Sequence, residues 1–186
     1  MRSTVTLRLG LRPSASQRDG KKQRRPVEGE GESIMHLTSS ELFFMALGVL
    51  SIVAILGANL HLFRMPGISA LEAVYYLTAL AALVIGWYFN FQYFRAYGPE
   101  VGWVNWTTLL FANPAAASGG QDLVIANVVI FPLWTIIDGR RVGMRAAWLY
   151  FPMSLVTSYA FGVALYLALR DRQVRLNRGG DLALAV

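Results

Sequence analysis

The sequence contains no cysteine and only two histidines, His36 and His61. The missing cysteines exclude disulfides, thiolate nucleophiles and cysteine-ligated metals, and two histidines are too few for a histidine-rich metal site. The sequence also shows no acid–base pair, nucleophile–base set, glycine-rich phosphate loop or nucleic-acid-binding module. These absences argue against a hydrolase or a kinase. We therefore expect a non-enzymatic protein with no cofactor and no nucleic-acid partner.

Charged residues are scarce as well. They make up 15% of the 186 residues, whereas 55% are hydrophobic and the mean hydropathy is +0.43. Soluble domains usually carry close to a quarter charged residues. A soluble domain of this size could not bury so much apolar surface, so the lipid bilayer is the natural solvent for this chain.

Four apolar segments predict an all-α membrane protein. We expect a bundle of four transmembrane helices within residues 35–178, followed by a flexible C-terminus over residues 179–186. The first, second and fourth segments have the ~20 apolar residues that crossing a bilayer requires. The four predicted helices cover about residues 42–63, 71–94, 123–137 and 146–169.

The third predicted helix is short. Its 15 residues between Asp122 and Asp138 rise only about 22 Å, against a hydrocarbon core of roughly 30 Å. Gly119 and Gly120 are expected to break a longer helix, and the third helix is expected to start just after Ser118. Either the bilayer thins locally, or the stretch at residues 112–121 dips into the membrane to complete the crossing.

Between the second and third segments, Trp103, Trp106 and Leu110 recur at positions i, i+3 and i+7. This spacing predicts a short amphipathic helix in the membrane interface, with its tryptophans at headgroup depth. The alternative is an ordinary loop that two tryptophans anchor.

Residues 1–34 contain eight Lys and Arg residues and little apolar surface. We predict a disordered basic tail, or a segment that is not translated because synthesis starts at Met35. With four crossings, the positive-inside rule places the tail and both termini in the cytoplasm of a bacterial inner membrane. Without the tail, the two sides carry nearly equal numbers of basic residues, and the rule decides little.

Small residues form stripes on the second and fourth segments. Such stripes let membrane helices approach closely, so we expect these two helices to pack face to face, although a ligand groove is the alternative. Pro132 and Pro152 are expected to kink the third and fourth helices. The stripe residues are Thr78, Ala82 and Gly86, followed by Asn90, on the second segment, and Ser154, Ser158 and Gly162 on the fourth.

Asp122 is the carboxylate with the most functional interest. It either stabilises the start of the third helix or forms an intramembrane polar cluster with Asn90, Gln92 and Asn127, as groups on proton or ion pathways do. His61 is a weak candidate ligand for a tetrapyrrole metal; the alternative is a hydrogen-bonded interfacial histidine.

Asp138 lies at the end of the third predicted helix, where the helix dipole disfavours a negative charge. Arg140 and Arg141 follow it closely in the sequence. We therefore expect Asp138 to pair with Arg141 or Arg140 in this turn.

From the second segment onward the chain resembles a family of small bacterial membrane proteins known as domain of unknown function 2834. The resemblance covers about residues 75–176 and implies a three-helix membrane unit with no established activity. In that family the turn usually opens with glutamate, where this chain has Asp138. The similar stretches are Gly86-Trp-Tyr-Phe-Asn-Phe91, Leu110-Phe-Ala-Asn-Pro114 with Asp122-Leu123, Asp138-Gly-Arg-Arg-Val-Gly-Met144 and Leu165-Tyr-Leu-Ala-Leu-Arg-Asp-Arg172.

Two functional hypotheses follow. The first is an accessory or structural subunit of a larger membrane assembly, in contact with the bilayer and with other membrane subunits. The second is a small carrier or binder of a lipophilic or proton-coupled ligand, which needs a cavity between the second, third and fourth helices with Asp122 facing inward. An enzyme that acts on a membrane lipid ranks last.

Overall fold

Long apolar helices dominate the computed structural model, which describes residues 39–184 and the side chains as far as residue 179. This part of the chain is helical and contains no strand, which confirms the predicted all-α class. The predicted basic tail at residues 1–34 and the predicted start at Met35 lie outside the described residues.

Three helices are long and apolar enough to cross a membrane. The first is α1 (Ser39–Ala58). The second is α2 (Ala70–Tyr97), which the short 3-10 turn η2 (Gly98–Glu100) extends. The third consists of α4 (Pro114–Ile125), η3 (Ala126–Ile130) and α5 (Phe131–Val142), which follow one another without a break. Their exposed surfaces are rich in Leu, Val, Ile and Phe, as contact with lipid tails requires.

The third of these helices is longer than the sequence predicted. It spans 29 residues from Pro114 to Val142, or roughly 43 Å, which exceeds the roughly 30 Å of a hydrocarbon core. Asn113 caps its start, because its side-chain oxygen accepts a hydrogen bond from the Ala116 amide at 2.9 Å. Gly119 and Gly120 lie inside the helix and do not break it. A Cβ at Gly120 would lie 2.6 Å from the Leu110 carbonyl oxygen, so this glycine allows close packing.

Pro132 changes the local winding of this helix. Proline has no amide hydrogen, so the carbonyl of Val128 loses its usual partner four residues later. The five residues before Phe131 are π-helical. Single π-helical turns of this kind are frequent at functional sites, and Asn127 lies within this one.

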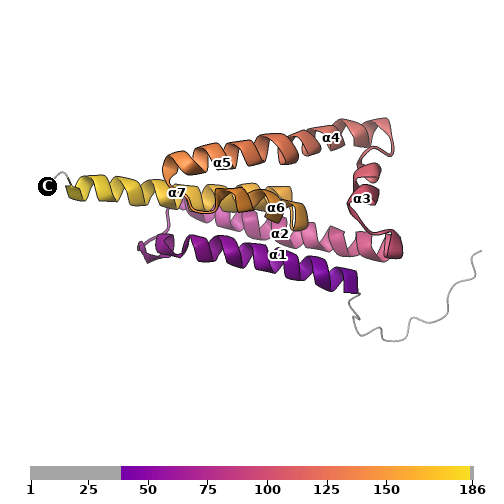
Figure 1. Cartoon of the computed structure of the whole chain (residues 1–186), viewed down its shortest axis with the longest axis horizontal. Helices are drawn as coiled ribbons and strands as arrows, with labels where there is room; N and C mark the ends of the chain where they lie inside the picture. Colours follow the sequence, from indigo (N-terminus) through magenta and orange to yellow (C-terminus); the bar gives the residue numbers. More distant parts are fainter. Residues whose placement is uncertain (1–38, 185–186) are drawn as a thin grey trace, which may run out of the picture. The chain divides into compact units, whose positions relative to one another are not determined.

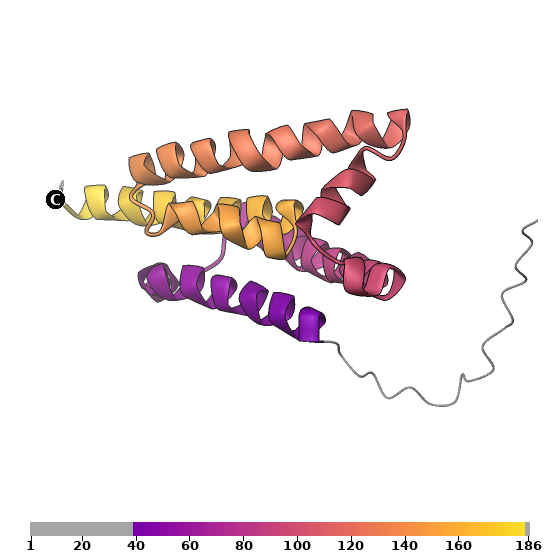
Figure 2. The ribbon, with the colours of Figure 1, turned by 45° about the vertical axis from the view of Figure 1, so that its right-hand side comes forward.

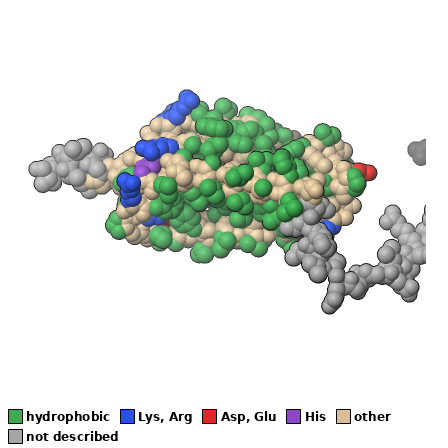
Figure 3. All heavy atoms as spheres, turned by 60° about the horizontal axis from the view of Figure 1, so that its bottom comes forward, with side chains coloured by type: hydrophobic (Ala, Val, Ile, Leu, Met, Phe, Trp, Pro, Cys, Tyr) green, Lys and Arg blue, Asp and Glu red, His purple; other side chains and the backbone are tan. Residues whose placement is uncertain are grey.

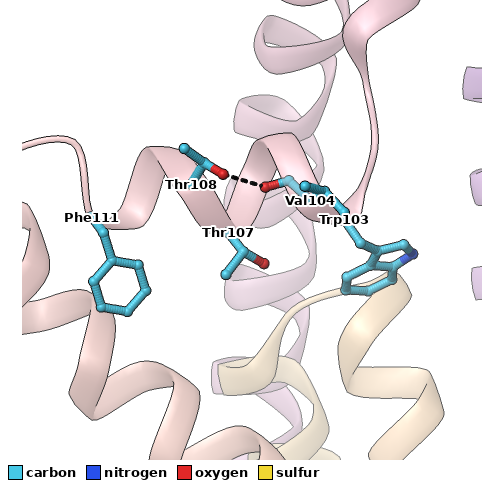
Figure 4. Close-up of a pocket in the computed structure, with 5 residues that line it drawn as sticks. All are labelled: Trp103, Val104, Thr107, Thr108 and Phe111. Atoms are coloured by element: carbon cyan, nitrogen blue, oxygen red, sulfur yellow. Dashed lines mark hydrogen bonds between the residues drawn. The ribbon is translucent and has the colours of Figure 1, made fainter.

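The predicted short helix around the tryptophans is present as α3 (Trp103–Leu110). It connects α2 to α4 at one end of the bundle (Figure 1). Trp103, Val104 and Phe111 expose 44%, 82% and 47% of their surface. They border a shallow hollow of about 560 Å³ (Figure 4). Apolar side chains on this exposed face suit the depth of the lipid headgroups.

The segment predicted as the fourth crossing is not one straight helix but a helical hairpin, which packs with the three helices that are long and apolar enough to cross a membrane. A 3-10 turn, η4 (Ala147–Leu149), leads into α6 (Tyr150–Val156), and the chain then reverses into α7 (Tyr159–Leu184). Contacts between the two arms show the reversal. The rings of Tyr150 and Tyr166 are 5.1 Å apart, and a Cβ at Gly162 would lie 3.0 Å from Ser154 Cβ.

The reversal has a local cause at Thr157 and Ser158. The Thr157 hydroxyl donates to the Met153 carbonyl at 2.7 Å. The carbonyl oxygen of Ser158 accepts the Gly162 amide at 3.0 Å, and its hydroxyl accepts the Phe161 amide at 3.4 Å. Ser158 therefore caps the start of α7. Pro152 lies in the first turn of α6, where proline is tolerated, and is not the position of the break.

The hairpin leaves the two ends of the described chain at opposite ends of the bundle, as Figures 1 and 2 show. The turn between α1 and α2, which includes η1 (Leu60–Arg64), lies at the same end as the turn between α5 and α6 and the later part of α7. We call this the arginine end, and we call the end that carries α3 the cavity end. α7 continues to Leu184, so the predicted flexible C-terminus is helical to that residue.

Candidate functional site

Glu72 forms the centre of an ion-pair network at the arginine end. It lies in the first turn of α2 and is fully buried. Arg172 of α7 donates to one of its carboxylate oxygens at 2.6 Å, and Arg175 contacts the other. Arg172 also donates to the carbonyls of Leu62 at 2.9 Å and Met65 at 2.8 Å. Both the buried acid and the buried guanidinium thus have several partners, as buried charges require.

A second ion pair joins α5 to α7. Arg170 donates two hydrogen bonds to the Asp138 carboxylate, from Nε at 2.5 Å and from Nη2 at 2.9 Å. The Tyr166 hydroxyl donates to the same carboxylate at 2.6 Å. The ion-pair partner of Asp138 is therefore Arg170 of the hairpin, 32 residues further along the chain, and not Arg140 or Arg141 as predicted; Arg141 acts on Asp138 only by longer-range electrostatic attraction.

His61 has a structural position at the same end. Its Nε2 lies 3.2 Å from Oε1 of Gln173 on α7, so the structure places it in a contact between the first turn and the hairpin. Asn59 lies nearby and is fully buried. Its side-chain oxygen accepts a hydrogen bond from the Arg145 amide at 3.2 Å, and its side-chain nitrogen donates one to the Arg145 carbonyl at 3.1 Å. These contacts hold the two turns of the arginine end side by side.

The hairpin tip packs against glycines deep in the bundle. A Cβ at Gly86 would lie 3.0 Å from Ser158 Cβ, and one at Gly48 would lie 3.3 Å from the Thr157 methyl group. Gly86 is sixteen residues from the start of α2, or roughly 24 Å along the helix. The tip therefore lies well inside the apolar zone of the bundle, where irregular backbone is tolerated only when protein surrounds it or when it borders a cavity.

A cavity of about 430 Å³ adjoins the hairpin tip. The hairpin fills the bundle from the arginine end only as far as its tip, and the cavity occupies the space beyond it, towards α3. Aromatic and aliphatic side chains line most of this space. They include Phe44, Phe89, Phe94, Val101, Trp103, Trp106 and Leu123.

Polar groups border the cavity on the side of the tip and of the π-helical turn. Asn127 is buried and lines the cavity, and its Oδ1 lies 2.7 Å from the hydroxyl of Ser154. Within residues 39–179, the amide nitrogen of Asn127 has no hydrogen-bond partner, and neither does the side chain of Asn90, which lines the cavity from α2. Both amides are thus available to a bound molecule.

The start of α7 adds backbone donors. Tyr159 and Ala160 line the cavity. As the first two residues of α7, they have no partner in the described part of the chain for their amide hydrogens, since only the next two amides bond to Ser158. The positive end of the helix dipole lies at the same place. The cavity therefore combines an apolar body with a cluster of hydrogen-bond donors at one wall.

Two members of the predicted polar cluster meet here, and two do not. Asn90 and Asn127 border the same cavity, whereas Asp122 and Gln92 are exposed and do not line it. Of the stripes, Gly86 meets Ser158 and Ser154 meets Gly162. Ser154 and Gly162 therefore face each other across the hairpin, and Thr78 is exposed, with its hydroxyl bonded to the Val74 carbonyl.

Several residues of these networks were not identified from the sequence. Ser69 and Glu72 have the spacing of a capping box, and the Ser69 hydroxyl oxygen accepts the Glu72 amide at 3.0 Å. That spacing was the available signal for Glu72. Nothing local marks its partners Arg172 and Arg175, because they lie about a hundred residues away in the chain.

Comparison with known proteins identifies the family but no characterised relative. Neither the curated proteins nor the solved structures contain a match to the chain. A family model matches residues 74–172, from α2 to the paired arginine of the hairpin. The matched region includes most of the cavity wall and both arms of the hairpin as far as Arg172. The chain belongs to the family described as protein of unknown function DUF2834.

Proposed function

We propose that this protein is a non-enzymatic membrane protein that binds a lipophilic molecule with a polar head in the cavity beyond the hairpin tip. The observation that supports this proposal is that hydrogen-bond donors without a partner and aromatic side chains line the same cavity. Ligand pockets in proteins are mostly apolar, with a few placed polar groups, and commonly measure about 300–1,000 Å³. The cavity of about 430 Å³ fits that description.

The chemistry of the wall defines the head group. The amide nitrogen of Asn127 and the free backbone amides of Tyr159 and Ala160 are donors. They favour a molecule whose polar head accepts hydrogen bonds, such as a carbonyl or a carboxylate. The aromatic lining accommodates the apolar remainder of that molecule. In this proposal Asp122, the residue on which the sequence-based hypothesis relied, has no role in binding.

A brominated stearic acid provides a direct test, because bromine quenches tryptophan fluorescence and Trp103 and Trp106 line the cavity. We expect saturable quenching in detergent micelles. The variant Asn127→Leu should weaken binding about tenfold or more, since it removes a hydrogen bond to a charged group. Ala160→Leu, which narrows the cavity, should weaken binding as well.

The matched control is Ala81→Leu, on the exposed surface of α2 outside the cavity. This variant should bind the probe as the unchanged protein does. Quenching that does not saturate, or an equal response in all three variants, would refute the proposed binding site.

The accessory-subunit role stays a prediction. The exposed apolar faces of α1 and α2 suit lipid tails and the helices of another membrane protein equally well. These faces therefore do not favour a subunit role over simple contact with lipid.

The distribution of arginines in the described residues bears on the orientation that we propose in a bacterial inner membrane. Residues 39–184 contain nine arginines. Eight of them lie at the arginine end, in its turns or in the helix segments next to them, and only Arg95 lies towards the cavity end. Counted over residues 39–184 alone, the positive-inside rule favours a cytoplasmic arginine end, whereas the eight Lys and Arg residues that precede α1 count for the opposite side. With three crossings, the start of α1 then lies on the opposite side. This proposal differs from the prediction, based on four crossings, that both termini are cytoplasmic.

A further inference from the structure

Apart from Arg178, which is exposed near the end of α7, the arginines of the arginine end fall into two groups. Arg170, Arg172 and Arg175 belong to the hairpin and are paired with acids. The other group consists of exposed arginines in or next to the turns, and we call these the turn arginines. They are Arg64, Arg140, Arg141 and Arg145.

The hairpin arginines use all the acids that the structure describes at this end. Asp138 is bound by Arg170, Glu72 by Arg172 and Arg175, and Asp171 by Arg175 at 3.1 Å. Within residues 39–179 no acidic side chain lies within ion-pair distance of a turn arginine. Arg141 is attracted by Asp138 without forming an ion pair with it, and the guanidinium groups of the turn arginines can still bind an external anion. Figure 3 shows blue side chains gathered at this end, next to a body covered by hydrophobic side chains.

The turn arginines also lie at or next to the ends of helices that are long and apolar enough to cross a membrane. Arg140 and Arg141 occupy the last turn of α5, where a membrane-crossing helix ends. Arg64 ends η1, just beyond α1. Asn59 holds the backbone of Arg145 against the end of α1 through its two hydrogen bonds. Two turns that are far apart in the sequence thus present their cations together at one membrane surface.

From these observations we infer that the turn arginines bind the phosphate of an anionic lipid in the leaflet at the arginine end. Guanidinium groups suit phosphate because they donate parallel hydrogen bonds to its oxygens. Basic clusters between membrane helices, at the cytoplasmic surface, bind anionic headgroups in this way. The inference is independent of the cavity, which lies at the other end of the bundle and is lined by no arginine.

Native mass spectrometry with added lipid tests this site. Dioleoylphosphatidylglycerol should bind the detergent-solubilised protein more tightly than dioleoylphosphatidylcholine, which has the same tails and no net charge. The double variant R140Q/R141Q should lose affinity for phosphatidylglycerol by about fivefold for each arginine removed. Its affinity for phosphatidylcholine, whose choline group balances the charge of the phosphate, should fall much less.

The matched control is R95Q, which removes an exposed arginine near the opposite end of the bundle. It should leave the binding of phosphatidylglycerol at the level of the unchanged protein. Should the double variant fail to fold, salt gives a second measure: phosphatidylglycerol binding by the unchanged protein should weaken as salt rises. Equal binding of the two lipids, an R95Q loss as large as that of R140Q/R141Q, or salt-independent binding would overturn the inference.

Discussion

The arginine end and the cavity end of this bundle are built in opposite ways. At the arginine end, charged residues from three segments of the chain are buried or half-buried, and each acid that the structure describes there is held by arginine. At the cavity end, uncharged amides and backbone donors border a space that no side chain fills. The hairpin joins the two, because its base forms the ion pairs and its tip forms a wall of the cavity.

This difference indicates that one end of the bundle stabilises the fold and the other end binds the ligand. The ion pairs fix the base of the hairpin, since a buried charge without its partner is strongly unfavourable. The rigid base holds the tip in place although the tip leaves some of its own donors unused. Binding sites commonly combine a well-packed support with locally unsatisfied groups in this manner.

Removing the central acid should have the largest effect on this comparison. Glu72→Gln leaves the buried Arg172 without its charged partner, so the free energy of unfolding should fall by about 3–5 kcal/mol. Glu100→Gln, an exposed position near α3, should change it by less than about 0.5 kcal/mol. Thermal unfolding in detergent measures both variants. Similar stability of the two would show that the network does not hold the hairpin.

Packing at the hairpin base should give the next largest effect. In Gly139→Ala the new methyl group would lie 2.6 Å from the Cβ of Ala147, so overpacking should cost about 1–3 kcal/mol. The control is Gly57→Ala near the end of α1, where nothing lies within 4 Å. That variant should be neutral or more stable by up to about 1 kcal/mol, because alanine favours helix. The same unfolding assay distinguishes them, and a reversed order would contradict the close packing seen at Gly139.

The smallest effect on stability is expected at the cavity. Asn90→Ala removes a side chain that has no hydrogen-bond partner within residues 39–179. The free energy of unfolding should therefore change by no more than about 0.5 kcal/mol. The same variant should weaken binding of brominated stearic acid. A large loss of stability with unchanged binding would reverse the roles assigned to the two ends.

The sequence predicted the crossings better than their connections. Runs of apolar residues between 42 and 94 gave α1 and α2 to within a few residues, apart from the end of α1, because lipid exposure demands such runs. The early end of α1 at Ala58 depends on Asn59, whose amide bonds a turn 86 residues away. A local pattern carries no information about a contact of that kind.

The hairpin escaped prediction for a related physical reason. Two apolar arms of opposite direction have the same composition as one straight helix, so hydropathy cannot separate them. The single local signal is the pair Thr157 and Ser158, whose hydroxyls end one helix and cap the next.

Gly119 and Gly120 led to the opposite error. They were predicted to break a helix, whereas Gly120 brings α4 close to the end of α3.

The direction of α7 is the claim on which both the cavity and the charge distribution depend. The chain has no cysteine, so single cysteines can be placed at Ile68, Gly179 and Thr107 and labelled with a membrane-impermeant maleimide in intact and in opened cells. The hairpin predicts that Ile68→Cys and Gly179→Cys react from the same side, and that Thr107→Cys reacts from the other. If Gly179→Cys instead reacts together with Thr107→Cys, α6 and α7 form one crossing helix and the account is wrong.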